Sequence, residues 1–248
     1  MQKMLAEIRY SLTIFSRNTG GMFWTFGFPI MLFVILGFMY SPQAASMPGV
    51  GNMMEFMLPG IIGMSIMSAS MNSTVAINVK NRARGIFRKL ATTPVSRIEW
   101  NASKIITQAI ITLLSVGLSV VFAGLVFNLH PNVDIIAILL VIVGTITFVG
   151  LGLIIASLLK SEESATSAAN MVTFPLMFLS GSFFPVDNMP WFFKLFADVS
   201  PLTYLNNGLR DTMISGNPGD AVTSLIIVAS IGAVFFVAGV AALKWKED

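Results

Sequence analysis

The chain has 248 residues, of which 55% are hydrophobic and 11% charged, with a formal net charge of +3. The core of a soluble domain of this size could not hide so much apolar surface, so we predict an all-α polytopic membrane protein with one transmembrane domain over residues 1–248. The absence of cysteine excludes disulfides, thiolate metal sites and cysteine nucleophiles. The modest positive charge lies almost entirely beside apolar runs, so it does not indicate binding to nucleic acid.

The first 20 residues combine three basic residues with apolar residues that recur every three or four positions. This pattern predicts an amphipathic helix over residues 1–20 that lies along the inner membrane interface. A signal peptide is the alternative, since Ala44-Ala45-Ser46 faintly resembles a cleavage site. The apolar run is too long for the apolar region of such a peptide, so we reject this alternative.

Six apolar runs are suited to crossing a bilayer, which takes about 20 residues of helix. We expect spans at residues 22–40, 56–79, 105–129, 135–159, 165–181 and 221–243. The fifth is short and contains Pro175. Without it, Lys244 and Lys246 would lie outside, against the positive-inside rule.

Residues 182–217 alternate prolines with aromatic residues, in a pattern too interrupted for a continuous helix through lipid. We predict that they form two short helices dipping into the outer leaflet as a re-entrant hairpin. Irregular backbone at that depth must be sheltered by protein or line a watery cavity.

Basic residues are concentrated at positions 81–97, between the second and third spans. Of the 15 Lys and Arg, all but Lys194 and Arg210 fall on the side of this segment, which predicts that both termini are cytoplasmic. The segment also has helical periodicity, and Pro94 would end that helix. We predict a short amphipathic cytoplasmic helix here, although charge alone equally allows a loop that only sets topology.

The chain carries little sign of chemistry of its own. It has no G-x-x-x-x-G-K-[S/T] loop for a nucleotide, and its single histidine, His130, lies outside any H-E-x-x-H pattern. The spans lack the charged residues of an ion-coupled carrier and the clustered Asp, His or Ser of a membrane-embedded enzyme. We therefore expect no catalytic residue, metal site or bound cofactor, so that a transporter of this kind would take its energy from elsewhere.

Four segments together resemble the type-2 permeases of ATP-binding cassette (ABC) transporters, which in bacteria and archaea are typically exporters. They are Phe28-Pro29-Ile30, Met57-Leu58-Pro59-Gly60-Ile61, residues 84–96, and the stretch from Phe178 to Arg210 that contains FLSG, FP and SPLTY. In this order and spacing they cover nearly the whole chain.

The resemblance implies that residues 81–97 form a coupling helix that docks on a separate ATPase subunit. The residues implied in coupling are Arg84, Gly85, Ile86, Phe87, Arg88, Lys89, Leu90, Thr93 and Pro94. It further implies a prokaryotic cell-membrane complex of two permease chains, expected to be identical, with two ATPase subunits that bind the ATP and Mg²⁺.

The resemblance also implies a translocation path lined by the second and fifth spans and an outer gate formed by the hairpin. The path residues would be Ser65, Ser68, Asn72, Asn170, Thr173, Phe174, Met177 and Phe178, and the gate residues Phe183, Phe184, Pro185 and Trp191. In both spans, plain helix packing is the competing interpretation of these side chains.

A surface rich in Met and Phe can repack around varied apolar molecules, which suggests an amphipathic drug, antibiotic or lipid as substrate. The same aromatics could stack on sugar rings, as in a permease for polysaccharides or lipid-linked glycans. An ATP-independent carrier or channel is the alternative from another class.

Overall fold

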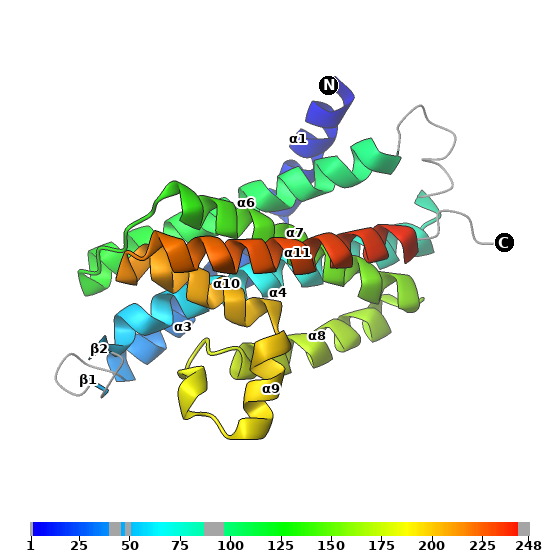
Figure 1. The fold of residues 1–248 in the computed structure, drawn as a ribbon. Coiled ribbons are helices and arrows are strands. Elements are labelled where there is room, and N and C mark those ends of the chain that lie inside the picture. The colour runs from blue at the N-terminus through cyan, green and yellow to red at the C-terminus, as the bar shows by residue number, and fades with distance from the viewer. Residues whose placement is uncertain (1, 40–45, 48–50, 87–96, 243–248) are drawn as a thin grey trace.

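A computed structural model describes residues 2–39, 46–47, 51–86 and 97–242 as a bundle of long helices, which confirms the predicted all-α class (Figure 1). Its first half consists of α1 (Gln2–Arg17), α2 (Thr19–Met22), the π-helical turn η1 (Phe23–Gly27), α3 (Phe28–Met39), α4 (Met53–Ala83) and α6 (Arg97–Phe127). Its second half consists of α7 (Ile135–Leu158), α8 (Glu162–Leu179), η2 (Val186–Asn188), α9 (Trp191–Val199), α10 (Pro201–Arg210), η3 (Asp211–Ser215) and α11 (Pro218–Ala242). The two-residue strands β1 (Ser46–Met47) and β2 (Gly51–Asn52) pair antiparallel before α4.

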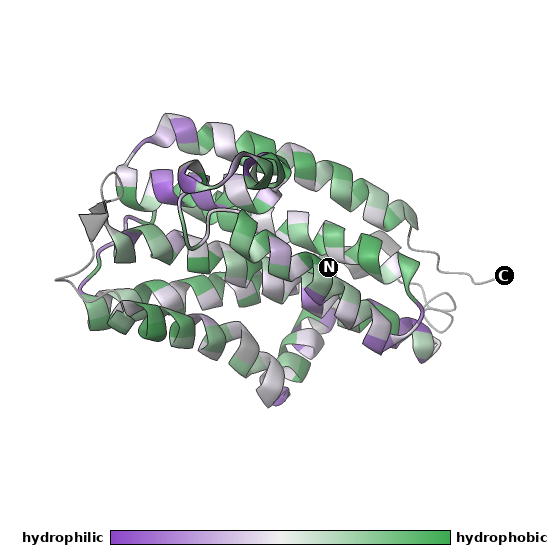
Figure 2. Cartoon of the chain, turned by 90° about the horizontal axis from the view of Figure 1, so that it is seen from below, coloured by the Kyte–Doolittle hydropathy of each residue, from purple (hydrophilic) through white to green (hydrophobic). Residues whose placement is uncertain are grey.

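Five helical segments of the described chain are long and apolar enough to cross a membrane. They are Thr19–Met39, Met53–Ala83, Ala102–Phe127, Ile135–Leu158 and Pro218–Ala242, and they match five of the six predicted spans. Hydrophobic residues cover most of the length of these helices (Figure 2). The chain is therefore a multi-pass membrane protein.

The sixth predicted span, residues 165–181, coincides with α8 but is not apolar enough to join the other five. The first half of α8 holds Glu162, Glu163 and two serines. Ser161 caps this helix by accepting a hydrogen bond from the main-chain N–H of Ser164. A sixth crossing therefore stays a prediction.

The first span is interrupted where Pro29 enters it. Proline has no N–H to donate and its ring crowds the carbonyl four residues back, which here belongs to Thr25. The helix widens into the π-helical turn η1, and Ser115 Oγ on α6 donates to Thr25 O at 2.8 Å in place of the missing N–H. The first span thus accommodates Pro29 by a π turn that is tied to the third span.

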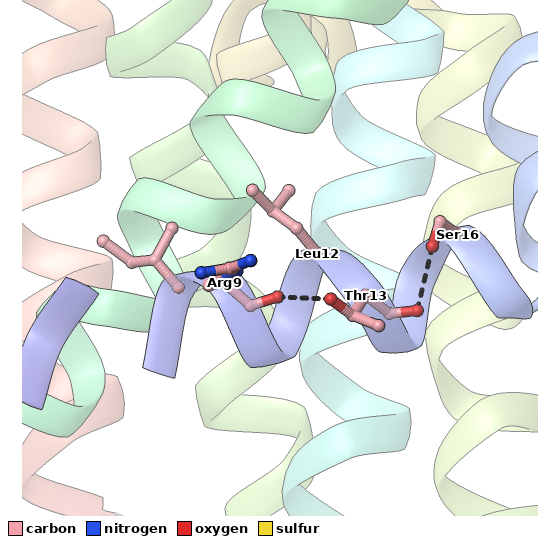
Figure 3. Close-up of a pocket in the computed structure, with 5 residues that line it drawn as sticks. Arg9, Leu12, Thr13 and Ser16 are labelled. Atoms are coloured by element: carbon pink, nitrogen blue, oxygen red, sulfur yellow. Dashed lines mark hydrogen bonds between the residues drawn. The ribbon is translucent and has the colours of Figure 1, made fainter. Parts of the chain in front are cut away.

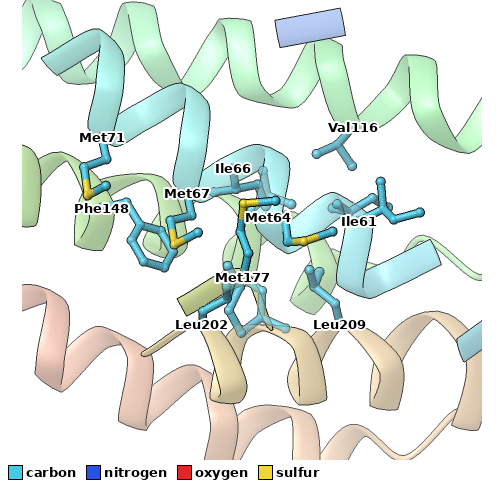
Figure 4. Packing of buried hydrophobic residues seen from close by; sticks show 14 of the residues in the cluster. Ile61, Met64, Ile66, Met67, Met71, Val116, Phe148, Met177, Leu202 and Leu209 are labelled. Carbon is cyan, nitrogen blue, oxygen red and sulfur yellow. The ribbon is translucent and has the colours of Figure 1, made fainter. Parts of the chain in front are cut away.

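The core forms around α4, which packs against α7, α8 and α10, while α11 lies along α7. Three methionines of α4, Met64, Met67 and Met71, are almost fully buried with Phe148 of α7 and Leu202 of α10 (Figure 4). Unbranched Met side chains fill irregular gaps between helices that cross at different angles.

Close approach between α7 and α11 depends on glycine. A Cβ on Gly150 would lie 2.6 Å from the main-chain N of Phe236, and one on Gly239 would lie 2.7 Å from Gly150 O. Small residues that let backbones approach are typical of helix packing in membranes, where apolar burial adds little.

The ends of the helices sort into two groups. The end of α4, the start of α6 and the end of α11 lie at one end of the bundle, opposite the β1–β2 ladder (Figure 1). At the end of the bundle where α4 ends, Arg82 donates through Nη1 to Leu159 O at 3.2 Å and so caps the C-terminus of α7. The basic residues of 81–86 therefore share an end of the bundle with the last turn of α11, as the charge pattern predicts.

Candidate translocation path and outer junction

The coupling region is described at its two borders. Helix α4 ends at Ala83, and Gly85 adopts a left-handed conformation with φ 63° and donates to Arg82 O at 3.0 Å. A glycine in this conformation just after a helix is a common terminator because it carries no Cβ. Arg84 and Gly85 thus lie in the turn after α4, and Ile86 is again helical. The other predicted coupling residues, Phe87, Arg88, Lys89, Leu90, Thr93 and Pro94, lie outside the described residues.

Helix α1 is bound to the first turns of α6 by Lys104. Its ammonium donates to Glu7 Oε1 at 2.7 Å and to Ser11 Oγ at 2.8 Å, and it lies 5.5 Å from the ring centroid of Trp100. The opposite side of α1 bears a shallow surface hollow lined by Ile8, Arg9, Leu12, Thr13 and Ser16 (Figure 3). That α1 lies on the inner membrane interface stays a prediction.

The predicted path residues of α4 lie on one half-exposed face. Ser65 donates to Ile61 O at 2.7 Å, and Asn72 donates to Ser68 Oγ at 3.3 Å, so these donors are satisfied within their own helix. The carbonyl oxygen of the Asn72 side chain is buried and has no partner among the described residues. The face is therefore polar, with small side chains, and the Asn72 side-chain oxygen lies unpaired beneath it.

The predicted path residues of α8 divide between two faces. Thr173 and Met177 are 4% and 8% exposed, and Met177 joins the core with α4 (Figure 4). Phe174 and Phe178 are 58% and 55% exposed on the other side of the helix. Asn170 is half-buried between them. Thr173 and Met177 are thus on the buried face of α8, which packs against α4. The two phenylalanines are on an exposed apolar face that points away from the bundle.

The predicted gate residues are also divided. Phe183 is buried, with its ring 5.5 Å from that of Phe178, whereas Phe184 and Trp191 are 48% and 75% exposed. Pro185 directly precedes η2, and Trp191 begins α9, which stands away from the bundle (Figure 1). The helix after it, α10, is packed into the bundle against α4, α7 and α11. Two short helices, α9 and α10, thus occupy this stretch, with α9 peripheral and α10 part of the core, and a re-entrant hairpin in the outer leaflet stays a prediction.

The turn at residues 180–182 packs directly onto the first turns of α4. A Cβ on Gly60 would lie 2.2 Å from Ser182 O, and one on Gly63 would lie 2.0 Å from the side-chain oxygen of Asn206. At Gly60 the obstacle is backbone, so no side chain fits there, and at Gly63 it is the Asn206 side chain, which would have to shift. We call this contact between α4, the turn 180–182 and α10 the outer junction.

Two side chains of α10, one turn apart, hold the outer junction together. Asn206 donates to Ser180 O at 3.1 Å and to Ser182 Oγ at 2.9 Å. Arg210 donates through Nε to Phe56 O at 3.2 Å and through Nη2 to Gly181 O. Both side chains therefore bond main-chain carbonyl groups as well as side chains, so they fix the backbone of neighbouring segments.

Arg210 is a cation in a largely apolar setting. Its guanidinium carbon lies 3.7 Å from the ring centroid of Phe56, close enough for a cation–π contact. Burial lowers the pKa of Arg210 to about 10, and the neighbouring Asp211 acts in the opposite direction. The guanidinium remains charged at neutral pH, which strengthens its hydrogen bonds to the two carbonyls.

In the sequence, Arg210 stands out as an exception to the charge rule and as the end of the family-like stretch from Phe178, and Asn206 is not among the predicted site residues. The four-residue spacing of these two residues, after the N-cap Ser200, is the signal that could have placed both on one face of a short helix.

Comparison with known proteins gives a consistent result. A family profile described as ABC-2 type transporter matches residues 3–214. The linearmycin resistance permease protein LnrN of Bacillus subtilis is 26% identical over 164 residues, which make up 66% of this chain and 43% of that protein.

Two further relatives are similar at the same level. The probable multidrug ABC transporter permease YbhS of Escherichia coli is 24% identical over 197 residues, 78% of this chain and 52% of YbhS. Nodulation protein J of Rhizobium leguminosarum bv. viciae is 29% identical over 124 residues, 50% of this chain and 45% of that protein. The chain spans about half the length of these curated relatives.

Proposed function

Because the chain belongs to the ABC-2 type transporter family, we propose that it is the membrane-spanning subunit of an ATP-driven exporter. Two copies would pair, and each would bind a separate ATPase subunit that carries ATP and Mg²⁺. The permease would lie in a prokaryotic cell membrane with both termini in the cytoplasm. This orientation is supported by the basic residues at the end of the bundle where α4 ends and α6 begins.

The ATPase subunit would act on residues 81–97. These residues connect α4 to α6, and each of those helices has 31 residues, or about 46 Å at 1.5 Å per residue. A bilayer with its headgroups is about 40–45 Å thick. Movement at this segment would therefore reach the far side of the membrane through two continuous helices.

The proposed substrate is an amphipathic drug, antibiotic or lipid-like molecule, and the outer face of α8 carries this proposal. Met171, Phe174 and Phe178 follow one another at three- and four-residue spacing and are 79%, 58% and 55% exposed. Apolar surfaces of this kind mark sites of contact with membranes, proteins or ligands. The relatives named for linearmycin resistance and multidrug transport favour the same substrate class.

A glycan substrate is the second candidate, since Trp191 is 75% exposed at the start of α9 and an exposed indole can stack on a sugar ring. Stimulation of ATP hydrolysis in the purified complex separates the two. Amphipathic dyes and lipids should raise the rate of ATP hydrolysis severalfold, and oligosaccharides should not. The reverse pattern would favour a glycan substrate.

Insertion of three glycines between Thr93 and Pro94 tests the coupling mechanism. A flexible insert should separate movement of the ATPase subunit from movement of α4 and α6, so ATP hydrolysis should continue while export of an amphipathic dye is lost. The same insertion between Pro48 and Gly49, on the opposite side of the membrane in the proposed topology, is the matched control. Undiminished export by the Thr93–Pro94 insertion would contradict the proposal.

A further inference from the structure

The outer junction connects the two ends of the predicted machinery. Helix α4 begins at Met53, one turn before the junction residue Phe56, and ends at Ala83, inside residues 81–97. The turn 180–182, held in the same junction, leads directly to Phe183, Phe184 and α9, where the outer gate is predicted. The junction is therefore a direct route by which a displacement of the inner end of α4 can reach the gate, beside the packing of α4 against α8.

The bonds of the junction are suited to transmission. Arg210 bridges two carbonyls that belong to different segments, Phe56 O on α4 and Gly181 O after α8. Asn206 adds Ser180 O and Ser182 Oγ. Carbonyls are fixed parts of the backbone, so side chains that bridge them hold two backbones together. An arginine fork that bonds two acceptors loses less rotational freedom per bond than a lysine would.

The packing indicates a connection that stays closed. Gly60 lies so near Ser182 O that no water fits between the two backbones at that point. Separation of the turn from α4 would remove partners from several carbonyl groups and from a charged guanidinium in a setting with few replacement donors.

We propose that Arg210 and Asn206 are positioning residues for transport, which fasten the outer gate to α4 so that the gate moves whenever α4 moves. This inference rests on the proposed function. In it, the ATPase subunit displaces residues 81–97, α4 carries the displacement outward, and the turn 180–182 follows as part of the same rigid unit. Neither residue touches the substrate.

A single reporter cysteine tests the proposal, because the chain has no cysteine of its own. Phe184→Cys, at a side chain that is 48% exposed, is placed in the complex with its ATPase subunit. The rate of its modification by a membrane-impermeant maleimide is measured with and without ATP and vanadate. In the otherwise unchanged chain, we expect nucleotide trapping to change this rate at least fivefold.

Adding Arg210→Ala together with Asn206→Ala should abolish that nucleotide effect, and Arg210→Ala alone should at least halve it, while ATP hydrolysis stays within twofold of its original rate. Arg210→Lys, which keeps the charge but lacks the planar fork, should retain less than half of the effect and serves if the alanine variant does not fold. Lys194→Ala removes the other outer basic residue and should retain the full effect. A full nucleotide effect in Arg210→Ala or Arg210→Lys would overturn the proposal, whereas no effect in the unchanged chain would overturn the proposed function itself.

A covalent replacement of the junction gives an independent result. In Phe56→Cys/Arg210→Cys, ATP-dependent export of rhodamine 6G should fall at least fivefold. Closing the two cysteines with a short thiol-specific crosslinker should restore at least half of the lost export, because the link again joins α10 to α4. A further loss on crosslinking would show that the junction must open, and would contradict a permanent connection.

Discussion

Replacing Gly60 with alanine tests the geometry of the outer junction most simply. The added Cβ would lie 2.2 Å from Ser182 O and 2.9 Å from Ser182 Cα, so backbone and not a flexible side chain is in the way. An ordinary carbon–oxygen contact is about 3.3 Å, so the turn must move by about 1 Å. Such a shift breaks the bond from Arg210 to Gly181 O and weakens the bonds made by Asn206.

The magnitudes decide the sign of the effect. Loss of a charge-assisted hydrogen bond costs about 1.5–3 kcal/mol and of a neutral one about 1 kcal/mol. Alanine gains about 1 kcal/mol over glycine in a helix. We therefore expect Gly60→Ala to lower the free energy of unfolding by about 1.5–3 kcal/mol, which corresponds to a fall in melting temperature of about 4–8 °C for a net 2 kcal/mol.

The assay is thermal unfolding of the detergent-solubilised chain, followed by tryptophan fluorescence. Gly117→Ala is the matched control, because Gly117 also lies within a long helix but a Cβ there would meet nothing within 4 Å. It should leave the melting temperature unchanged or raise it. If Gly60→Ala proved as stable as Gly117→Ala, the close contact between α4 and the turn 180–182 would be refuted.

Four further substitutions have distinct expected outcomes. Gly150→Ala, which sets a Cβ 2.6 Å from the backbone of α11, should lower stability by about 1–3 kcal/mol, and a melting temperature equal to that of the original chain would contradict this. Lys104→Ala should lower the free energy of unfolding by less than about 1 kcal/mol, because its ion pair with Glu7 is partly exposed. Trypsin should nevertheless cleave α1 faster in this variant. An unchanged cleavage rate would mean that other contacts hold α1. Phe174→Ala and Phe178→Ala should each change stability by less than about 0.5 kcal/mol, but reduce stimulation of ATP hydrolysis by amphipathic dyes severalfold, and undiminished stimulation would exclude this face from substrate contact.

The sequence predicts the long helices well because each apolar run is a local signal. The runs at 56–79, 135–159 and 221–243 correspond to α4, α7 and α11 with ends displaced by a few residues. The run at 105–129 ends two residues early, at Phe127, since Asn128 turns the chain with φ 54°. Residues 165–181 form a helix whose polar first half falls short of the apolar character of the other spans.

The outer junction could not be predicted in the same way, because its partners are far apart in the chain. Gly60 belongs to a motif that the sequence analysis recognised, but the reason for a glycine is Ser182 O, more than a hundred residues later. Arg210 is an exception to the charge rule, and the carbonyls that it bonds, those of Phe56 and Gly181, lie far from it in the sequence.

The division of the path residues was within reach of the sequence. Thr173 and Met177 lie four residues apart, as do Phe174 and Phe178, so helical periodicity separates the two pairs by one step around the helix. Treating all five residues of α8 as one cluster ignored this separation, and the structure shows the first pair buried and the second exposed.

Reconstitution in lipid vesicles tests the central claim most directly. ATP-dependent movement of rhodamine 6G is measured with the chain alone and with the chain bound to its ATPase subunit. The account predicts movement only when the ATPase subunit and ATP are both present. Equal movement of the dye by the chain alone would contradict it and would assign the protein to the ATP-independent carriers or channels.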